Sequence, residues 1–151
     1  MYDINNVFTH TYSAGTDADL YQTITADAAS SNLIDLDKTN IKLGAGKPMF
    51  IIAKVGTLFA TTVSMEIRMQ TDTDSAFGTV LKDYLLGRWA VAQLTAGALL
   101  LNIPMPVMQY QRYVRLYFNM FTNATAGTLF AALADSPEEA ALQVDHVEAA
   151  S

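Results

Sequence analysis

Apolar and polar residues alternate along several short stretches of the chain, and a period of two predicts half-buried β-strands. The alternation is clearest over Thr62–Thr71. One side of this stretch is apolar and is expected to face a core: Val63, Met65, Ile67 and Met69. The other is polar and is expected to face solvent: Ser64, Glu66, Arg68 and Gln70. Glu66 and Arg68 share the polar face, which predicts a weak surface ion pair.

The stretch Arg112–Ala134 contains two more apolar runs. In Arg112–Thr122, one side of the alternation is Val114, Leu116, Phe118 and Met120. The turn-forming residues Asn123-Ala124-Thr125-Ala126-Gly127 follow, and the apolar run Thr128–Ala134 comes after them. Two runs joined by about five loop residues predict a β-hairpin, whose apolar face needs further strands to cover it.

Other runs supply those strands, with turn-forming residues between them. The predicted strands are Leu20–Thr25, Asn32–Leu36, Pro48–Val55, Arg88–Leu94 and Ala98–Ile103, with Thr79–Tyr84 as a short strand or a turn. Pro48–Val55 is almost continuously apolar, which predicts a strand deep in a sandwich. Ala26–Ser31 is interpreted as a turn of small residues. Thr95-Ala96-Gly97 predicts a second hairpin.

These patterns predict an all-β fold, an antiparallel sandwich or barrel, over residues 20–135. Residues 1–19 are interpreted as an N-terminal arm and residues 136–151 as an acidic C-terminal tail. Pro137 stands at a first helical position, so Ser136–Val144 could form one or two helical turns. The apolar residues of the arm need a surface, which is either the chain's own body or a neighbouring subunit. They are Tyr2, Ile4, Val7, Phe8 and Tyr12.

Composition narrows the possible classes of protein. With 151 residues, 51% of them hydrophobic, the chain can build one core, which excludes a largely disordered protein. The net charge is −6, four carboxylates lie in the last fifteen residues, and no basic stripe is present, so we expect no nucleic-acid binding. No apolar window of about 20 residues occurs, so we expect no membrane span. The first residues lack the basic and apolar regions of a secretory signal.

No stretch carries the pattern of a known catalytic, cofactor or metal site. Gly44-Ala45-Gly46-Lys47 ends like a phosphate loop, but Ile41 and Pro48 stand where that loop needs Gly and Ser or Thr. The histidines, His10 and His146, lie in the two terminal segments and do not form a ligand set. The chain has no cysteine, which excludes disulfides and thiolate sites. We therefore expect no enzyme activity, no cofactor and no bound metal.

The run Asp72-Thr73-Asp74-Ser75 has carboxylates spaced as at the start of a calcium loop. The later Gly and the bidentate Glu of such a loop are missing, so the carboxylates are better explained as turn caps.

Several groups of residues occur in a fixed order along the chain. They are Gln22-Thr23-Ile24-Thr25 with Ala28–Leu36, Gln70-Thr71 with Asp74-Ser75-Ala76-Phe77, Leu94-Thr95-Ala96-Gly97 leading to Pro104, Arg112–Leu116, and Ala126-Gly127-Thr128. In this order and spacing, over roughly residues 14–136, the chain resembles the Bbp16-like capsid cement (decoration) proteins of tailed bacteriophages. The arm is longer than in the family pattern, and the tail from Ser136 is additional.

The resemblance implies a jelly-roll protein on the outer surface of the assembled virion capsid, made in the cytoplasm of the bacterial host. Its expected partners are the major capsid protein, whose neighbouring subunits it would bridge, and its own copies in a homodimer or homotrimer. The expected contacts are the arm residues Tyr2, Ile4, Val7, Phe8 and Tyr12, together with Arg88, Trp89 and Arg112, because Arg and Trp are favoured at interface centres.

Two other classes of function stay open. A carbohydrate-binding jelly roll of a phage fibre or attachment structure would use an aromatic platform, for which the candidates are Tyr84, Trp89, Tyr110 and Tyr113. It requires at least two coplanar rings along a groove. A β-barrel enzyme would require ionisable groups that converge inside the barrel, and the apolar inner faces argue against it.

Overall fold

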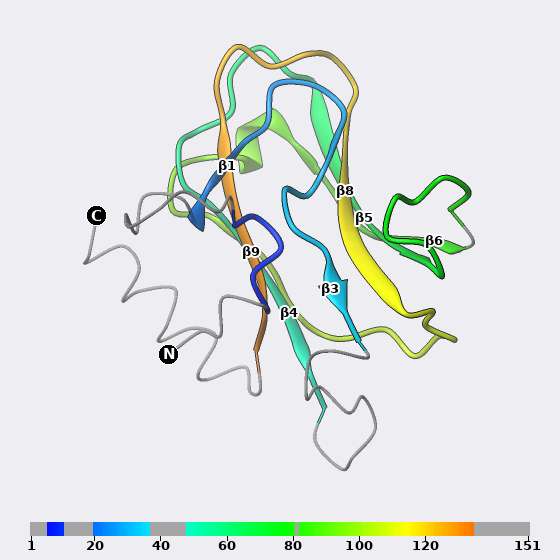
Figure 1. Ribbon diagram of the computed structural model, residues 1–151. Helices are drawn as coiled ribbons and strands as arrows, with labels where there is room; N and C mark the ends of the chain where they lie inside the picture. The colour runs from blue at the N-terminus through cyan, green and yellow to red at the C-terminus, as the bar shows by residue number, and fades with distance from the viewer. Residues whose placement is uncertain (1–5, 11–19, 37–47, 81, 135–151) are drawn as a thin grey trace.

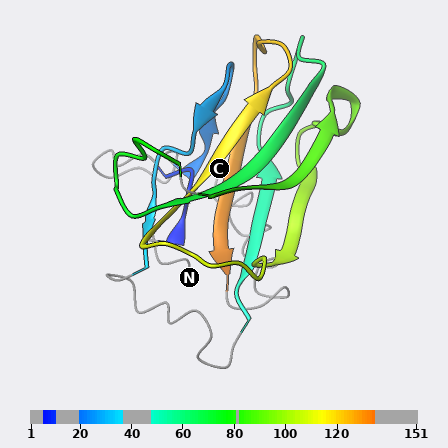
Figure 2. The same ribbon diagram turned by 90° about the vertical axis from the view of Figure 1, so that its right-hand side faces the viewer.

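Two antiparallel sheets form the fold, which the computed structural model describes for residues 6–10, 20–36, 48–80 and 82–134 (Figures 1 and 2). Sheet A has the order β1-β9-β4-β7, with β1 Gln22–Thr23, β4 Phe50–Val55, β7 Leu99–Pro104 and β9 Thr128–Ala134. Sheet B has the order β2-β8-β5-β6, with β2 Ala28–Ala29, β5 Ser64–Asp72, β6 Lys82–Ala90 and β8 Tyr113–Met120. Strand β3, Ile34–Asp35, also pairs with β8. The prediction of an all-β fold with antiparallel sheets is confirmed.

Strand β8 shows the predicted alternation of buried and partly exposed residues, whereas β5 is buried on both faces. In β8, every second residue from Val114 to Met120 is buried, and the residues between them are partly exposed. In β5, Met65, Ile67 and Met69 are fully buried as predicted. Ser64, Glu66 and Gln70, predicted to face solvent, are buried as well, because hydrogen-bonded side chains of β6 and β8 cover them. Val63, predicted to face the core, is 61% exposed because it precedes the first residue of β5.

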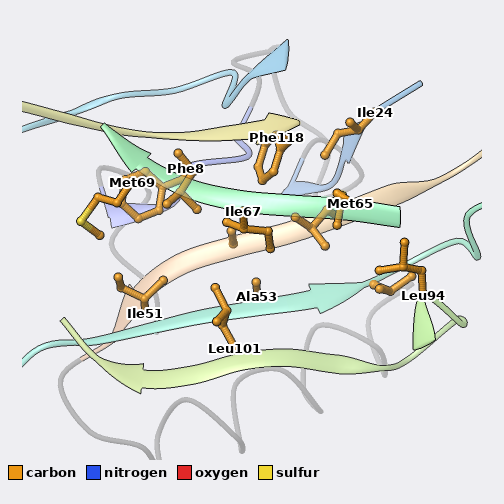
Figure 3. Packing of buried hydrophobic residues seen from close by; sticks show 14 of the residues in the cluster. Phe8, Ile24, Ile51, Ala53, Met65, Ile67, Met69, Leu94, Leu101 and Phe118 are labelled. Carbon is orange, nitrogen blue, oxygen red and sulfur yellow. The ribbon is translucent and has the colours of Figure 1, made fainter. Parts of the chain in front are cut away.

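Strand β4 is buried on both faces, as its continuous apolar run predicted. Its residues Ile51, Ala53 and Val55 belong to the main core between the sheets (Figure 3). Ile52 points the other way and packs with Val7 and Phe130 in a second, smaller cluster. Sheet A therefore has an apolar outer face as well as an apolar inner face.

Both predicted hairpins are wrong. Strands β8 and β9 follow one another in sequence, but β8 lies in sheet B and β9 in sheet A. One edge of β8 is paired with β5 and the other with β2 and β3, so no edge is left for β9. The second prediction fails in the same way, because β6 pairs with β5 whereas β7 pairs with β4.

Several predicted boundaries also change. Strand β6 runs from Lys82 to Ala90 and is followed by the 3₁₀ helix η3, Val91–Gln93, so the predicted breaks at Tyr84 and Arg88 do not occur. The predicted turn Ala26–Ser31 contains β2, and only two residues of Leu20–Thr25 form β1. The predicted helical turns of Ser136–Val144 and the glycine-rich stretch Gly44–Lys47 lie outside the described residues.

The loop between β8 and β9 closes over the core at a glycine. Gly127 has a φ of +148°, and a Cβ built on it would lie 2.3 Å from the ring of Phe59. Phe59 is itself buried in the main core. A glycine is therefore required here both by the backbone conformation and by the close approach of the ring.

Candidate interaction surface

The N-terminal segment contributes two buried side chains to the chain's own body. Val7 and Phe8 are both 0% exposed, Val7 in the outer cluster of sheet A and Phe8 in the main core (Figure 3). The prediction that these two residues contact a partner is therefore corrected, because a fully buried side chain has no free surface. Packing on the chain's own body, the alternative left open for the arm, applies to both. Tyr2, Ile4 and Tyr12 lie outside the described residues.

Residues 7–9 join the two sheets along one side of the sandwich. Phe8 donates its N–H to the carbonyl of Ala131 in β9 over 2.8 Å, and the Thr9 hydroxyl accepts from the N–H of Ala131 over 2.9 Å. Asn32, between β2 and β3, donates from its backbone to Phe8 and from its side chain to Val7. These bonds close the side where β9 faces β2 and β3.

The opposite side of the sandwich ends in β6 and β7, each the last strand of its sheet (Figure 2). Strand β6 is nine residues long, and Tyr84 and Leu85 within it are 50% and 45% exposed. Leu99 of β7 and Val107 of the following loop are also exposed. We call Tyr84 and Leu85, together with the β6 edge, the β6 flank. A long edge strand with exposed apolar side chains is a surface that commonly pairs with another chain.

The aromatic residues proposed as a sugar platform do not share one surface. Trp89 and Tyr110 are partly buried and pack against the main core, and the Trp89 ring lies where a Cβ on Gly87 would be. Tyr110 donates its hydroxyl to the carbonyl of Pro106. Tyr113 points to the outer face of sheet B, because its neighbour Val114 points into the core. Only Tyr84 of the four is exposed, so the coplanar groove that sugar binding requires is not formed by these residues.

The predicted Glu66–Arg68 ion pair is confirmed, with 3.3 Å between Arg68 Nη1 and Glu66 Oε2. Arg68 also binds Asp83 of β6, with 2.9 Å between Arg68 Nε and Asp83 Oδ1. The two carboxylates raise the pKa of Arg68, with the hydrogen bond to Asp83 as the largest cause. The outer face of sheet B is thus a network of charged side chains across β5, β6 and β8.

Two of the predicted contact residues, Arg88 and Arg112, lie at opposite ends of this outer face. Arg112 donates a bidentate pair of hydrogen bonds to the carboxylate of Asp35 in β3, from Nε to Oδ1 and from Nη2 to Oδ2, each over 3.0 Å. The guanidinium of Arg88 lies 3.7 Å from the centre of the Phe121 ring, which is 49% exposed. Arg88 and Phe121 therefore form an exposed pair of one cationic and one aromatic group, a combination that is common at the centre of protein interfaces.

The carboxylates of Asp72 and Asp74 cap a turn, as predicted. Asp72 Oδ1 accepts from the N–H of Asp74 over 3.1 Å, and Asp74 Oδ1 accepts from the N–H of Ala76 over 3.0 Å. The turn ends at Phe77, which has a φ of +51° and a ring 4.1 Å from the guanidinium carbon of Arg115. Burial is the largest cause of the lowered pKa of Arg115.

Neither a metal centre nor a membrane helix is found in the part of the chain that the structure describes. No three His, Cys, Asp or Glu side chains there are grouped closely enough to hold a metal ion. None of its helices has the length and apolarity to cross a membrane. What these residues offer instead is a free strand edge, exposed apolar side chains and arginines, which are the elements of a protein-binding surface.

Sequence reasoning missed the β6 flank because it divided β6 into two elements. The sequence carried one signal: Tyr84, Leu85 and Leu86 are consecutive apolar residues, so a strand through them must expose at least one.

Comparison with known proteins gives one family. The sequence model of the Bbp16 family matches residues 19–133, which is more than half of the chain. No curated protein matches the sequence.

Proposed function

The chain belongs to the Bbp16 family, and we propose that it is a structural protein of a phage head, a capsid cement or decoration protein. In this role it binds the outer surface of the assembled capsid and bridges neighbouring major capsid subunits. It acts by binding rather than by catalysis, and it is made in the bacterial host before it joins the virion. The family match over residues 19–133 carries the proposal, together with the collinear motifs that resemble the cement proteins.

We further propose that the two sheets are those of a jelly roll. Strands that are neighbours in sequence lie in different sheets at β4–β5, β6–β7 and β8–β9. The first strand, β1, pairs with the last, β9, and β2 pairs with β8. This order, 1-9-4-7 opposite 2-8-5-6, supports two interlocked Greek keys, the arrangement of jelly rolls in capsid proteins.

The exposed ring of Phe121, with the guanidinium of Arg88 held against it, is the surface that we propose for the capsid. Burying this ring against a partner removes apolar area from water. Many copies on one shell then add their small individual affinities. Because only the assembled lattice offers the bridging site, binding shifts the equilibrium away from disassembly.

The direct test uses purified protein and mature heads that lack it. The expected result is saturable co-sedimentation and a raised melting temperature of the heads. Phe121→Ala is expected to weaken binding, whereas Thr95→Ala, in the turn before β7, serves as a control. Absence of binding to every head form would refute the proposal.

The role of the N-terminal arm in head binding is tested by deleting residues 1–5 rather than residues 1–12. Removing residues 1–12 also removes Val7 and Phe8, which are part of the core. Removing residues 1–5 leaves those two side chains in place. If heads bind this shorter variant as well as the full chain, residues 1–5 make no essential contact.

A further inference from the structure

The outer edge of β6 offers backbone hydrogen bonds in a defined pattern. The N–H of Phe121 donates to the carbonyl of Ser64 over 3.0 Å, and the N–H of Val91 donates to the carbonyl of Val63 over 3.1 Å. In β5 the backbone groups of even-numbered residues therefore point to β8 and those of odd-numbered residues point to β6. Arg88 lies opposite an even-numbered residue, Glu66, so its own N–H and C=O point away from β5.

Beyond a β-bulge in β6, backbone groups of the strand again point away from β5. The pairing of β5 with β6 shifts by one residue between Ile67 and Arg68, which leaves Leu86 as the extra residue. Beyond it, Asp83 pairs with Gln70, again an even-numbered residue. Asp83 and Arg88 thus both present their backbone groups outward, and both side chains lie on the charged outer face of sheet B.

We propose that two copies of this chain pair through β6, antiparallel, about a two-fold axis that passes between Leu85 and Leu86. In this register, Asp83 of each copy lies opposite Arg88 of the other. Each such pair can exchange two backbone hydrogen bonds and form one ion pair between side chains on the same face. Isologous pairing of this kind closes after two copies.

The charged side chains near the two-fold axis favour a second copy of the chain as the partner. Asp83 already accepts from Arg68 of its own chain, whereas none of the ion pairs found among the described residues includes Arg88. In the pair of copies, Asp83 lies between two guanidinium groups, and Arg88 gains a carboxylate. Charge complementarity of this kind makes a second copy a better partner than an arbitrary extended strand.

The apolar groups fit the same register. Tyr84 pairs with Met69 and Gly87 pairs with Ile67, so both lie on the inner face of β6. The register sets Tyr84 of one copy opposite Gly87 of the other. The indole of Trp89 already covers this glycine, so the Tyr84 ring of one copy can pack against the Trp89 ring of the other. Leu85, which is exposed in the single chain, lies beside the axis and is shielded by pairing.

This inference identifies the surface of self-association and deepens the proposed function, but its test needs no capsid. The chain has no cysteine, so single cysteines can be introduced without background. Asp83→Cys and Arg88→Cys are expected to form a disulfide-linked dimer under mild oxidation only when the two proteins are mixed, because each site faces the other across the axis. Asp83→Cys mixed with Arg112→Cys is the control and is expected to stay uncrosslinked. Circular dichroism verifies that each variant is folded.

Charge reversal provides a second, independent measurement. Arg88→Glu places two carboxylates opposite each other at both ends of the pair, and the dimer dissociation constant in analytical ultracentrifugation is expected to rise at least about tenfold. The double variant Asp83→Lys with Arg88→Glu restores opposite charges and is expected to recover most of the affinity. A wild-type chain that stays monomeric at high micromolar concentration, or a double variant no better than Arg88→Glu, would overturn the register. Head binding that fails while the dimer persists would refute the capsid role alone.

Discussion

The side chain of Phe8 tests whether the N-terminal segment belongs to the body of the protein. Phe8 is 0% exposed and packs in the main core, and its backbone bonds to Ala131 and Asn32 do not involve the ring. Phe8→Ala therefore removes only the packing of the ring. Complete burial of the phenyl group places the expected loss in the upper range for core truncations, about 3–5 kcal/mol of unfolding free energy.

Phe121→Ala is the matched control, because it makes the same chemical change at a site that is 49% exposed. The substitution removes about half of the transfer free energy of a fully buried phenyl group, together with the contact to Arg88. The expected loss of unfolding free energy is therefore about 1–1.5 kcal/mol. In a domain of this size, these losses of unfolding free energy lower the melting temperature by about 6–20 °C for Phe8→Ala and by only a few degrees for Phe121→Ala.

Thermal and urea unfolding, followed by circular dichroism on the full chain, measure both variants under the same conditions. The urea midpoints separate a change in stability from a change in the surface exposed on unfolding. If Phe8→Ala costs no more than Phe121→Ala, the segment is a loosely attached arm, and the description of Phe8 as a core residue is refuted.

Three further changes have expected outcomes of their own. Gly127→Ala adds a Cβ 2.3 Å from the Phe59 ring at a φ of +148°, so urea unfolding should show a loss of at least about 1–3 kcal/mol. Gly87→Ala places a Cβ 2.5 Å from the indole of Trp89, the chain's one tryptophan; a shift in fluorescence emission is expected, and an unchanged spectrum would contradict that contact. Burial, with a smaller contribution from Tyr84, raises the pKa of Tyr110 to about 12. Because an unfolded tyrosine has a pKa near 10, this group stabilises the native state fully below about pH 10 and loses that effect as the pH rises through about 12. Tyr110→Phe should flatten this part of the curve of melting temperature against pH, and a curve identical to wild type would refute the assignment.

The strands were predictable where one local signal decides the structure. The alternation of Val114–Met120 specifies which face of β8 is buried, whatever the strand pairs with. In β5 the alternation identified the apolar face of Met65–Met69, but not the burial of the polar face under side chains of the neighbouring strands. The continuous apolar run of β4 likewise specified burial on both faces.

Strand pairing was not predictable, because it depends on which edges are free in three dimensions. The residues 123–127 have the composition of a hairpin loop, yet they carry the chain from one sheet to the other. Nothing in Thr128–Ala134 indicates that β1 and β4 occupy its edges. Of the predicted contact residues, the surface position of Arg88 followed from residue type, whereas the burial of Val7 and Phe8 depended on Ala131 and Asn32, which are distant in sequence.

The hydrogen bonds between Thr9 and Ala131 also determine when the fold can be completed during translation. Their partners are 122 residues apart in the sequence. At the rate of bacterial or eukaryotic translation, roughly 6–24 s separate the two residues on the ribosome. Throughout that interval Val7 and β1 lack the strand that they pair with, since β9 supplies it and is the last of the described strands to be made. The nascent chain must therefore keep its first apolar segment soluble until β9 emerges, and the sandwich closes only after Thr128–Ala134 has left the ribosome.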